Sequence, residues 1–213
     1  VLSKKSKNEL VYTANTGETV PTIQQISLVT KSRDSYKVTL PDGTMVWLNA
    51  NSSISFPFRF SGENRIVSAQ GELFFQVVHH RLAQGRPFVV EVNQQKIKVL
   101  GTAFNVRAYP SQKVQTSLVH GRVELSTAVS RVNIFAGQQA EMDGEKGFIL
   151  RSFDVDRVTA WRGGYFVFRE TSLQEVLTDL SHWYGFSVQG NRSLRSRVTA
   201  KIKKDIDLKT VLR

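Results

Sequence analysis

The chain has 213 residues, and its 29 lysines and arginines exceed its 18 aspartates and glutamates, which gives a net charge of +11. A hydrophobic share of 40% with 13 phenylalanines excludes a disordered or collagen-like chain, and no apolar run is long enough to span a bilayer. The absence of cysteine excludes disulfides, thiolate zinc sites and cysteine nucleophiles.

Residues 1–20 are predicted to form a polar linker or juxtamembrane leader, because they follow neither a strand period nor a helix period. No secretory leader pattern opens the sequence, and its first residue is Val1 rather than Met. We therefore expect a piece of a longer protein. The early lysine cluster at 4–7 fits a segment beside a membrane helix and fits a solvated terminus equally well.

Residues 21–156 are predicted to form an all-β domain. Tyr36, Val38 and Leu40 alternate with polar residues, and the turn sequence Pro41-Asp42-Gly43 leads into a second apolar strand. The same strand–glycine–strand arrangement recurs around Gly71, Gly101, Gly121 and Gly137. We expect a sandwich of stacked short strands or a β-helix-like stack, with glycine where the backbone turns sharply or packs closely.

Residues 157–213 are predicted to form a small α+β (βαβ) domain. The expected elements are a strand at 165–168, a helix at 172–184, strands at 186–188 and 198–202, and a helix from 207. Ser172 and Glu175 form a capping box, and Gly185 is typical of a helix end. The unit lacks its closing strand, so we expect a truncated domain with one strand edge available to a partner.

Few residues suit catalysis or metal binding. The four histidines are His79, His80, His120 and His182. The first two are neighbours that would point to opposite faces of a strand, so we assign them to a solvated loop. We place His120 in a turn and His182 on the polar flank of the predicted helix. We therefore predict no metal site, no cofactor and no enzymatic activity.

Three alternatives remain open from the residues alone. Carboxylates that follow glycine, at Glu63, Glu72 and Glu145, could serve a carbohydrate-active enzyme or a glycan-binding module. The tryptophans, Trp47, Trp161 and Trp183, could stack on sugars or bases, although core packing is the favoured interpretation. A nucleic-acid binder would need the basic residues to merge into one stripe interleaved with aromatics.

A further possibility concerns the bond between Gly101 and Thr102. A threonine hydroxyl directly after a glycine in a tight turn can attack the preceding carbonyl, and this N-to-O acyl shift would break the chain. The favoured interpretation is an ordinary glycine turn.

Several strings occur in a distinctive order: LPDGTMVWLNANSS (40–53), Arg65, GELFFQV (71–77), PFVV (87–90), VLGTAFNV (99–106), Tyr109, TSLVHGRV (116–123) and AGQQ (136–139). In this order they resemble the FecR family of anti-sigma factors and transmembrane signal transducers. The tail from Trp161 to Tyr184 resembles the C-terminal domain of the Bacteroidetes branch, which is similar to the secretin and TonB N-terminal short domain.

The resemblance implies the periplasmic portion of a single-pass inner-membrane protein. In this family that portion receives a signal from the N-terminal signalling domain of a TonB-dependent outer-membrane transporter. A cytoplasmic segment, which these residues do not include, binds an extracytoplasmic-function sigma factor. The resemblance implies no cofactor and no nucleic-acid partner.

We expect the partner to dock on the C-terminal domain, where basic residues would steer an acidic transporter domain. The candidate partner-binding residues are Tyr165, Phe166, Arg192, Arg195, Arg197, Lys201, Lys203 and Lys204.

Overall fold

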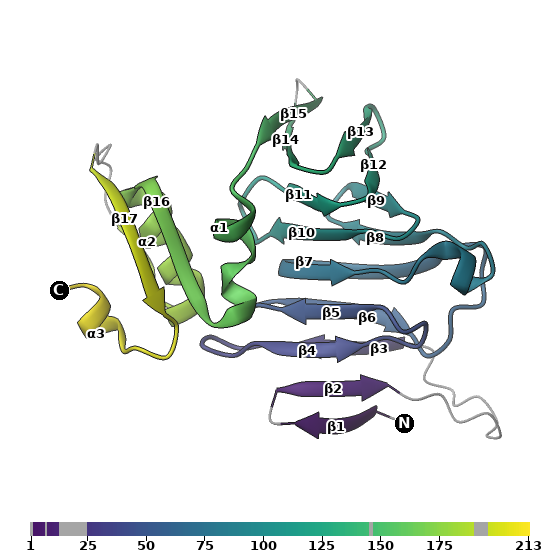
Figure 1. Ribbon diagram of the computed structural model, residues 1–213, viewed down its shortest axis with the longest axis horizontal. Helices are drawn as coiled ribbons and strands as arrows, with labels where there is room; N and C mark the ends of the chain where they lie inside the picture. The colour runs from purple at the N-terminus through teal and green to yellow at the C-terminus, as the bar shows by residue number, and fades with distance from the viewer. Residues whose placement is uncertain (1, 7, 13–24, 145–146, 190–195) are drawn as a thin grey trace.

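A computed structural model of the protein describes residues 2–6, 8–12, 25–144, 147–189 and 196–213 (Figure 1). The strands are β1 (Leu2–Ser6), β2 (Glu9–Tyr12), β3 (Gln25–Val29), β4 (Tyr36–Thr39), β5 (Met45–Leu48), β6 (Ser53–Pro57), β7 (Arg65–Gln76), β8 (Phe88–Val92), β9 (Gln95–Val99), β10 (Ala103–Ala108), β11 (Gln115–His120), β12 (Arg122–Ser126), β13 (Arg131–Phe135), β14 (Gln138–Asp143), β15 (Gly147–Ser152), β16 (Tyr165–Ser172) and β17 (Arg197–Lys203). The helices are η1 (His80–Ala83), α1 (Val155–Thr159), η2 (Ala160–Gly163), α2 (Leu173–Tyr184) and α3 (Leu208–Val211), where η denotes a 3₁₀-helix.

Strands β1 to β15 form a β-sandwich whose two layers share one long strand. The first half of β7 pairs with β6 and β8, and its second half pairs with β5 and β10. One layer therefore runs β1-β2-β4-β5-β7-β10-β11-β14-β15, and the other contains β3, β6, β7, β8, β9, β12 and β13. The prediction of a mainly β domain is confirmed. Of the two architectures predicted for it, a sandwich and a β-helix-like stack, the structure shows the sandwich.

The side chains between the layers form one apolar core. Val46, Phe75, Phe104 and Leu118 are all fully buried there, and the Phe75 and Phe104 rings stack with centroids 5.0 Å apart. Aromatic and branched side chains at alternate strand positions produce this core, because successive side chains of a strand point to opposite faces.

Gly71 marks the point where β7 passes from one layer to the other. Its φ of +90° lies in the region that favours glycine, and a Cβ atom there would lie 2.4 Å from the Ser52 hydroxyl oxygen. The glycine predicted at this turn is therefore required both by backbone conformation and by the close approach of the neighbouring chain.

A buried ion pair fixes the predicted hairpin to β7. Arg65 is fully buried, and its guanidinium donates to Asp42 over 2.7 Å and to the Val78 carbonyl over 3.1 Å. The turn aspartate that the sequence assigns to a hairpin thus also neutralises the buried Arg65 guanidinium, which stabilises both segments.

The C-terminal domain contains a two-stranded antiparallel sheet, β16 and β17, against which α2 packs (Figure 1). The predicted helix at 172–184 is confirmed: the Ser172 hydroxyl accepts a hydrogen bond from the Glu175 amide, and Gly185 ends the helix in the left-handed conformation. The predicted strand at 186–188 is wrong. Those residues follow the helix end as an extended loop.

The N-terminal segment also departs from the sequence prediction. Residues expected in a polar leader form β1 and β2, and β2 pairs in parallel with β4. Leu10 packs against the edge of the sandwich core, and this contact gives the segment a structural role that its composition does not reveal. Within the described residues, no helix is long and apolar enough to cross a membrane.

Candidate interaction site at the domain junction

The C-terminal domain packs on the outer face of the β5-β7-β10 layer, and the residues between them form the junction. Its own apolar cluster includes Phe166, Phe168, Leu180 and Trp183, and Ala50 of the sandwich completes it. Two hydrogen bonds add to this packing. The Arg33 amide donates to the Trp183 carbonyl over 2.8 Å, and the Asn51 side chain donates to the His182 carbonyl over 2.7 Å.

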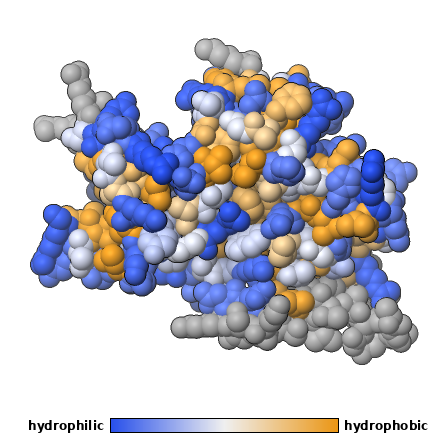
Figure 2. All heavy atoms as spheres, in the orientation of Figure 1, coloured by the Kyte–Doolittle hydropathy of each residue, from blue (hydrophilic) through white to orange (hydrophobic). Residues whose placement is uncertain are grey.

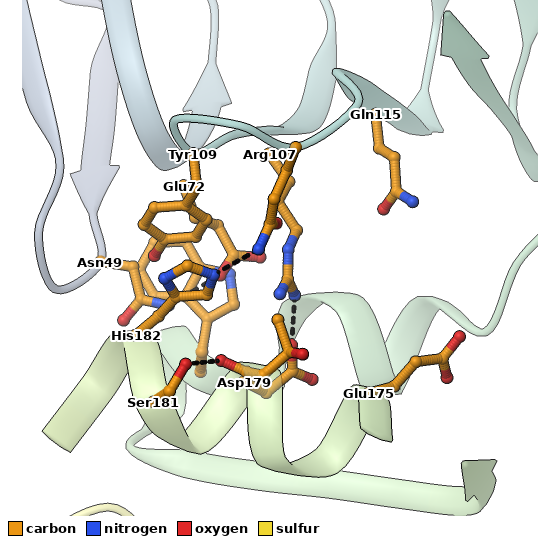
Figure 3. Close-up of polar contacts among 12 residues, drawn as sticks. Asn49, Glu72, Arg107, Tyr109, Gln115, Glu175, Asp179, Ser181 and His182 are labelled. Carbon is orange, nitrogen blue, oxygen red and sulfur yellow. Dashed lines mark hydrogen bonds and ion pairs between the residues drawn. The ribbon is translucent and has the colours of Figure 1, made fainter. Parts of the chain in front are cut away.

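An ion pair joins the sandwich to α2 at the centre of the junction. The Arg107 guanidinium on β10 lies 2.5 Å from the Asp179 carboxylate on α2 (Figure 3). Burial alone would lower the pKa of Arg107, but the charges of Asp179 and Glu72 outweigh it and raise the pKa. Arg107 is therefore a permanent cation held between two acids.

A stacked pair of rings lies beside this ion pair. The Tyr109 and His182 rings are parallel, with centroids 3.7 Å apart (Figure 3). The His182 Nε2 atom lies 2.8 Å from the Gln112 side-chain nitrogen. Burial and then the charge of Arg107 lower the pKa of His182 to about 4. A neutral ring can accept from the Gln112 amide, so His182 is a packing residue of the junction rather than a solvated residue on a polar flank.

The carboxylate of Glu72 organises a polar network under the C-terminal domain. It accepts hydrogen bonds from the side-chain amides of Asn49, over 2.8 Å, and Asn105, over 3.1 Å. Asn105 in turn accepts from the Trp161 indole over 3.2 Å. Burial and the nearby Glu72 raise the pKa of Tyr109. Trp161 therefore belongs to the junction and not to an exposed stacking platform.

Lys204 completes this network from the other domain. Only 3% of the residue is exposed, and its amine donates to the Asn49 side-chain oxygen over 2.6 Å. The amine lies 3.6 Å from the centre of the Trp183 ring, with Phe166 and Trp161 further out. Burial lowers the pKa of Lys204 to about 7.

A polar cleft of about 400 Å³ opens next to these contacts, between α1 and α2. It contains five carboxylates, from Glu72, Glu141, Asp154, Glu175 and Asp179. Each is engaged within the protein: Glu72 with Asn49 and Asn105, Glu141 with Gln115 and Lys113, Asp154 with Arg169, Glu175 with Arg157, and Asp179 with Arg107. These acids therefore hold the cleft walls together and do not form the free facing pair that glycoside hydrolysis requires.

The other residues proposed for chemistry are dispersed. Glu63 is an exposed loop residue, and Glu145 lies outside the described residues. The adjacent His79 and His80 lie at the start of η1, and nowhere in the described ranges do three histidine, aspartate or glutamate side chains gather as a metal site. Among the tryptophans, Trp183 is buried as predicted, while Trp47 is half-buried.

Gly101 and Thr102 lie in the turn between β9 and β10. Thr102 is buried, and its hydroxyl donates to the Arg122 carbonyl over 3.2 Å. A Cβ atom at Gly101 would lie 2.8 Å from the His79 Cα atom, so close packing accounts for the glycine. The hydroxyl is thus occupied by a structural hydrogen bond, as in the ordinary glycine turn that the sequence favours.

The predicted partner-binding residues divide into three groups. Arg197, Lys201 and Lys203 are exposed at alternate positions of β17, and Tyr165 faces them from β16, with the Lys201 amine 4.8 Å from its ring centre. Phe166 and Lys204 are buried, so their assignment to a docking surface is wrong. Arg192 and Arg195 lie outside the described residues.

The three exposed side chains are called the basic row below: Arg197, Lys201 and Lys203. In Figure 2 the C-terminal domain, on the left, shows hydrophilic patches interrupted by smaller hydrophobic ones. The basic row lies at exposed positions of β17, whereas Val198, Ala200 and Ile202 at the alternate positions pack against the apolar cluster of the domain.

Comparison with known proteins decides the family. The family model "FecR protein" matches residues 26–124, and the model "FecR, C-terminal" matches residues 165–213. The chain belongs to the FecR family. The two matches correspond to the sandwich from β3 to β12 and to the C-terminal domain from β16 onward, and the junction residues Glu72, Arg107, Asp179 and Lys204 lie within them.

Solved structures agree with this assignment. Two crystal structures of a proposed anti-sigma factor from Parabacteroides distasonis ATCC 8503, at 1.65 Å and 2.50 Å resolution, each match with 30% sequence identity and a TM-score of 0.76. Each match covers 88% of this chain and 88% of the other. A search of curated proteins found no match. The shared coverage means that this FecR-family chain and its structural neighbours contain both domains.

Proposed function

We propose that this FecR-family chain is the periplasmic signal-relay part of an inner-membrane anti-sigma factor. In this proposal the C-terminal domain receives a signal from the N-terminal signalling domain of a TonB-dependent outer-membrane transporter. The signal then passes through the sandwich and controls an extracytoplasmic-function sigma factor. The sigma factor would be bound by a cytoplasmic segment that is not among these 213 residues.

The observation that carries the proposal is the basic row on β17. Residues two apart in a strand share a face, and Lys201 and Lys203 are exposed on that face with Arg197 further along it. Charges arranged in this way raise the rate of encounter with an acidic partner. The Arg169 and Arg157 guanidinium groups, by contrast, are already paired with carboxylates of this chain, those of Asp154 and Glu175.

The strand geometry supports the same surface. Within the part of the chain that the structure describes, β16 and β17 pair only with each other, so each has one edge without a strand partner. A partner strand can extend such a sheet through backbone hydrogen bonds, while the basic row selects an acidic sequence. The partnered carboxylates of the cleft favour a binding role over catalysis.

Charge reversal on β17 tests the proposal. The double variant K201E/K203E should reduce the association rate with the signalling domains of transporters encoded near this protein by at least about tenfold at low salt. It should also weaken the dependence of that rate on salt concentration. Surface-based binding kinetics at several salt concentrations would measure both effects.

The matched control is K96E/K98E, which changes the net charge equally on exposed lysines of β9. It should alter the rate only slightly, through the overall charge of the molecule. Equal loss in both variants would show a non-specific charge effect. Unchanged kinetics in K201E/K203E would overturn the assignment of the basic row.

A further inference from the structure

Lys204 follows the basic row directly in the chain, yet its side chain lies in the junction with the sandwich. Lys203 is the exposed end of β17, and Lys204 is buried in the junction. Its amide donates to the Gly164 carbonyl over 2.9 Å, and its own carbonyl accepts from the Trp183 indole over 2.9 Å. Movement of the end of β17 therefore cannot occur without displacing the Lys204 backbone.

The Lys204 side chain ties this position to the sandwich. Its hydrogen bond to Asn49 crosses 155 positions of sequence and connects to Glu72 through the same amide. Around the amine lie rings from three separate elements: Trp161 of η2, Phe166 of β16 and Trp183 of α2. The Lys204 side chain therefore contacts three elements of the C-terminal domain, η2, β16 and α2, and one residue of the sandwich, Asn49.

We propose that Lys204 is a latch that fixes the orientation of the C-terminal domain on the sandwich, and that engagement of β17 by a partner loosens it. The second half of this statement rests on the proposed function, whereas the first half concerns the chain alone. The partner would shift the end of β17, draw the lysine away from Asn49 and leave the remaining junction contacts to hold the domain. The docking event would then change the geometry of the sandwich face that contains Glu72.

The other contacts make a partial release feasible. The Arg107–Asp179 ion pair and the Tyr109–His182 stack join β10 and the loop that follows it to α2, and neither contact involves Lys204. Loss of the latch would therefore permit a change of orientation without detaching the domain. A relay needs this property, because two arrangements of one interface must differ by a modest free energy.

The first arm of the test needs no partner. The chain lacks cysteine, so S68C and Q174C, at exposed positions of β7 and α2, can be labelled cleanly with nitroxide spin labels. Pulsed electron–electron double resonance then measures the distance between the two labels, one on each domain. We expect K204A to broaden this distance distribution at least twofold and K203A, its exposed neighbour, to leave it unchanged.

Hydrogen exchange across residues 153–164 provides a second readout of the same arm, with roughly tenfold faster exchange expected in K204A. Unchanged distances and unchanged exchange in K204A would overturn the latch. If K204A failed to fold, K204M, which keeps the apolar stem, would replace it under the same criteria.

The second arm adds an acidic signalling domain to the labelled wild type. Binding that broadens the distribution as K204A does supports the coupling, and binding without change overturns it. Failure of every signalling domain to bind would instead refute the proposed function, while the partner-free arm would still decide whether Lys204 fixes the orientation.

Discussion

At the scale of single residues, the junction contains ionisable groups that are buried more deeply than their chemistry normally allows. Lys204 is the clearest case, because lysine is rarely buried unless it is paired. Its amine donates a hydrogen bond to the neutral side chain of Asn49, and Asn49 in turn donates to the acid Glu72. The protein therefore retains a costly group where an apolar side chain would pack with less loss of hydration.

This burial predicts a specific pH dependence of stability. Burial lowers the pKa of Lys204 to about 7, from 10.5, although the charges of Glu72 and Asp179 act in the opposite direction. Between these two pH values the unfolded chain holds a proton that the folded chain has released, so the free energy of unfolding should rise with pH. Below pH 7 Lys204 is protonated in both the folded and the unfolded state, so it adds no pH dependence to the free energy of unfolding.

Chemical denaturation of wild type and K204M between pH 6.5 and pH 9.5 would measure the effect. The stability of wild type relative to K204M should increase by about 3 kcal/mol across this window. The upper limit avoids the range above pH 10, where the raised pKa of Tyr109 acts with the opposite sign. Parallel stability curves for the two proteins would contradict the assignment.

At the scale of elements, α2 is held by contacts of two kinds. Its apolar face contributes Val176, Leu180 and Trp183 to the cluster of the C-terminal domain. The flank beside this face presents Asp179 and His182 to β10 and the loop that follows it. The helix therefore connects the small domain to the sandwich, and its amphipathic pattern reveals only the first of these roles.

The ion pair between β10 and α2 should contribute measurably to this connection. We expect R107M to destabilise the protein by about 2 kcal/mol, because it leaves the partly buried Asp179 carboxylate without its cation. The control is E91Q, which breaks the exposed Lys96–Glu91 pair and should cost less than about 0.5 kcal/mol. Equal effects of the two substitutions, measured by urea denaturation, would show that the junction pair is no stronger than a surface pair.

The elements that the sequence predicts well are those specified by neighbouring residues. The hairpin around Pro41-Asp42-Gly43 and the helix after Ser172 are both confirmed, because turn and capping interactions involve groups within about four positions. The strand expected at 186–188 had no such local constraint, and its short apolar pattern fits a loop equally well. Strand β2 pairs with β4 and β1 pairs with β2, so the strands at 2–6 and 9–12 depend on a sheet edge that lies far along the chain.

The junction could not be predicted in the same way. The sequence places Lys204 at the end of a basic run and His182 on a polar helix flank, and both are exposed under that interpretation. Their burial depends on Asn49 and Tyr109, which lie far away along the chain. A sequence alone does not specify which surfaces of two domains meet. The residues of this network could therefore be named from the sequence, but their contacts could not be predicted.

At the scale of the whole molecule, the two domains differ greatly in the size of their cores. The sandwich buries a continuous apolar cluster from β4 to β14, whereas the C-terminal cluster contains six buried residues and one of them, Ala50, belongs to the sandwich. A unit of this size has little apolar area with which to offset its conformational entropy. The small domain therefore depends on the junction for part of its stability.

Separate expression of the two predicted domains would test this dependence. We expect residues 1–156 to unfold cooperatively and residues 157–213 alone to give poorly dispersed amide resonances, because Phe166 and Trp161 would lose their cover from the sandwich. A well-dispersed nuclear magnetic resonance spectrum for 157–213 would contradict the expectation and show an independent domain. Dependence on the junction would mean that a partner bound to β17 acts on a domain whose folding is already coupled to the sandwich, so that binding there would also change the stability of the junction.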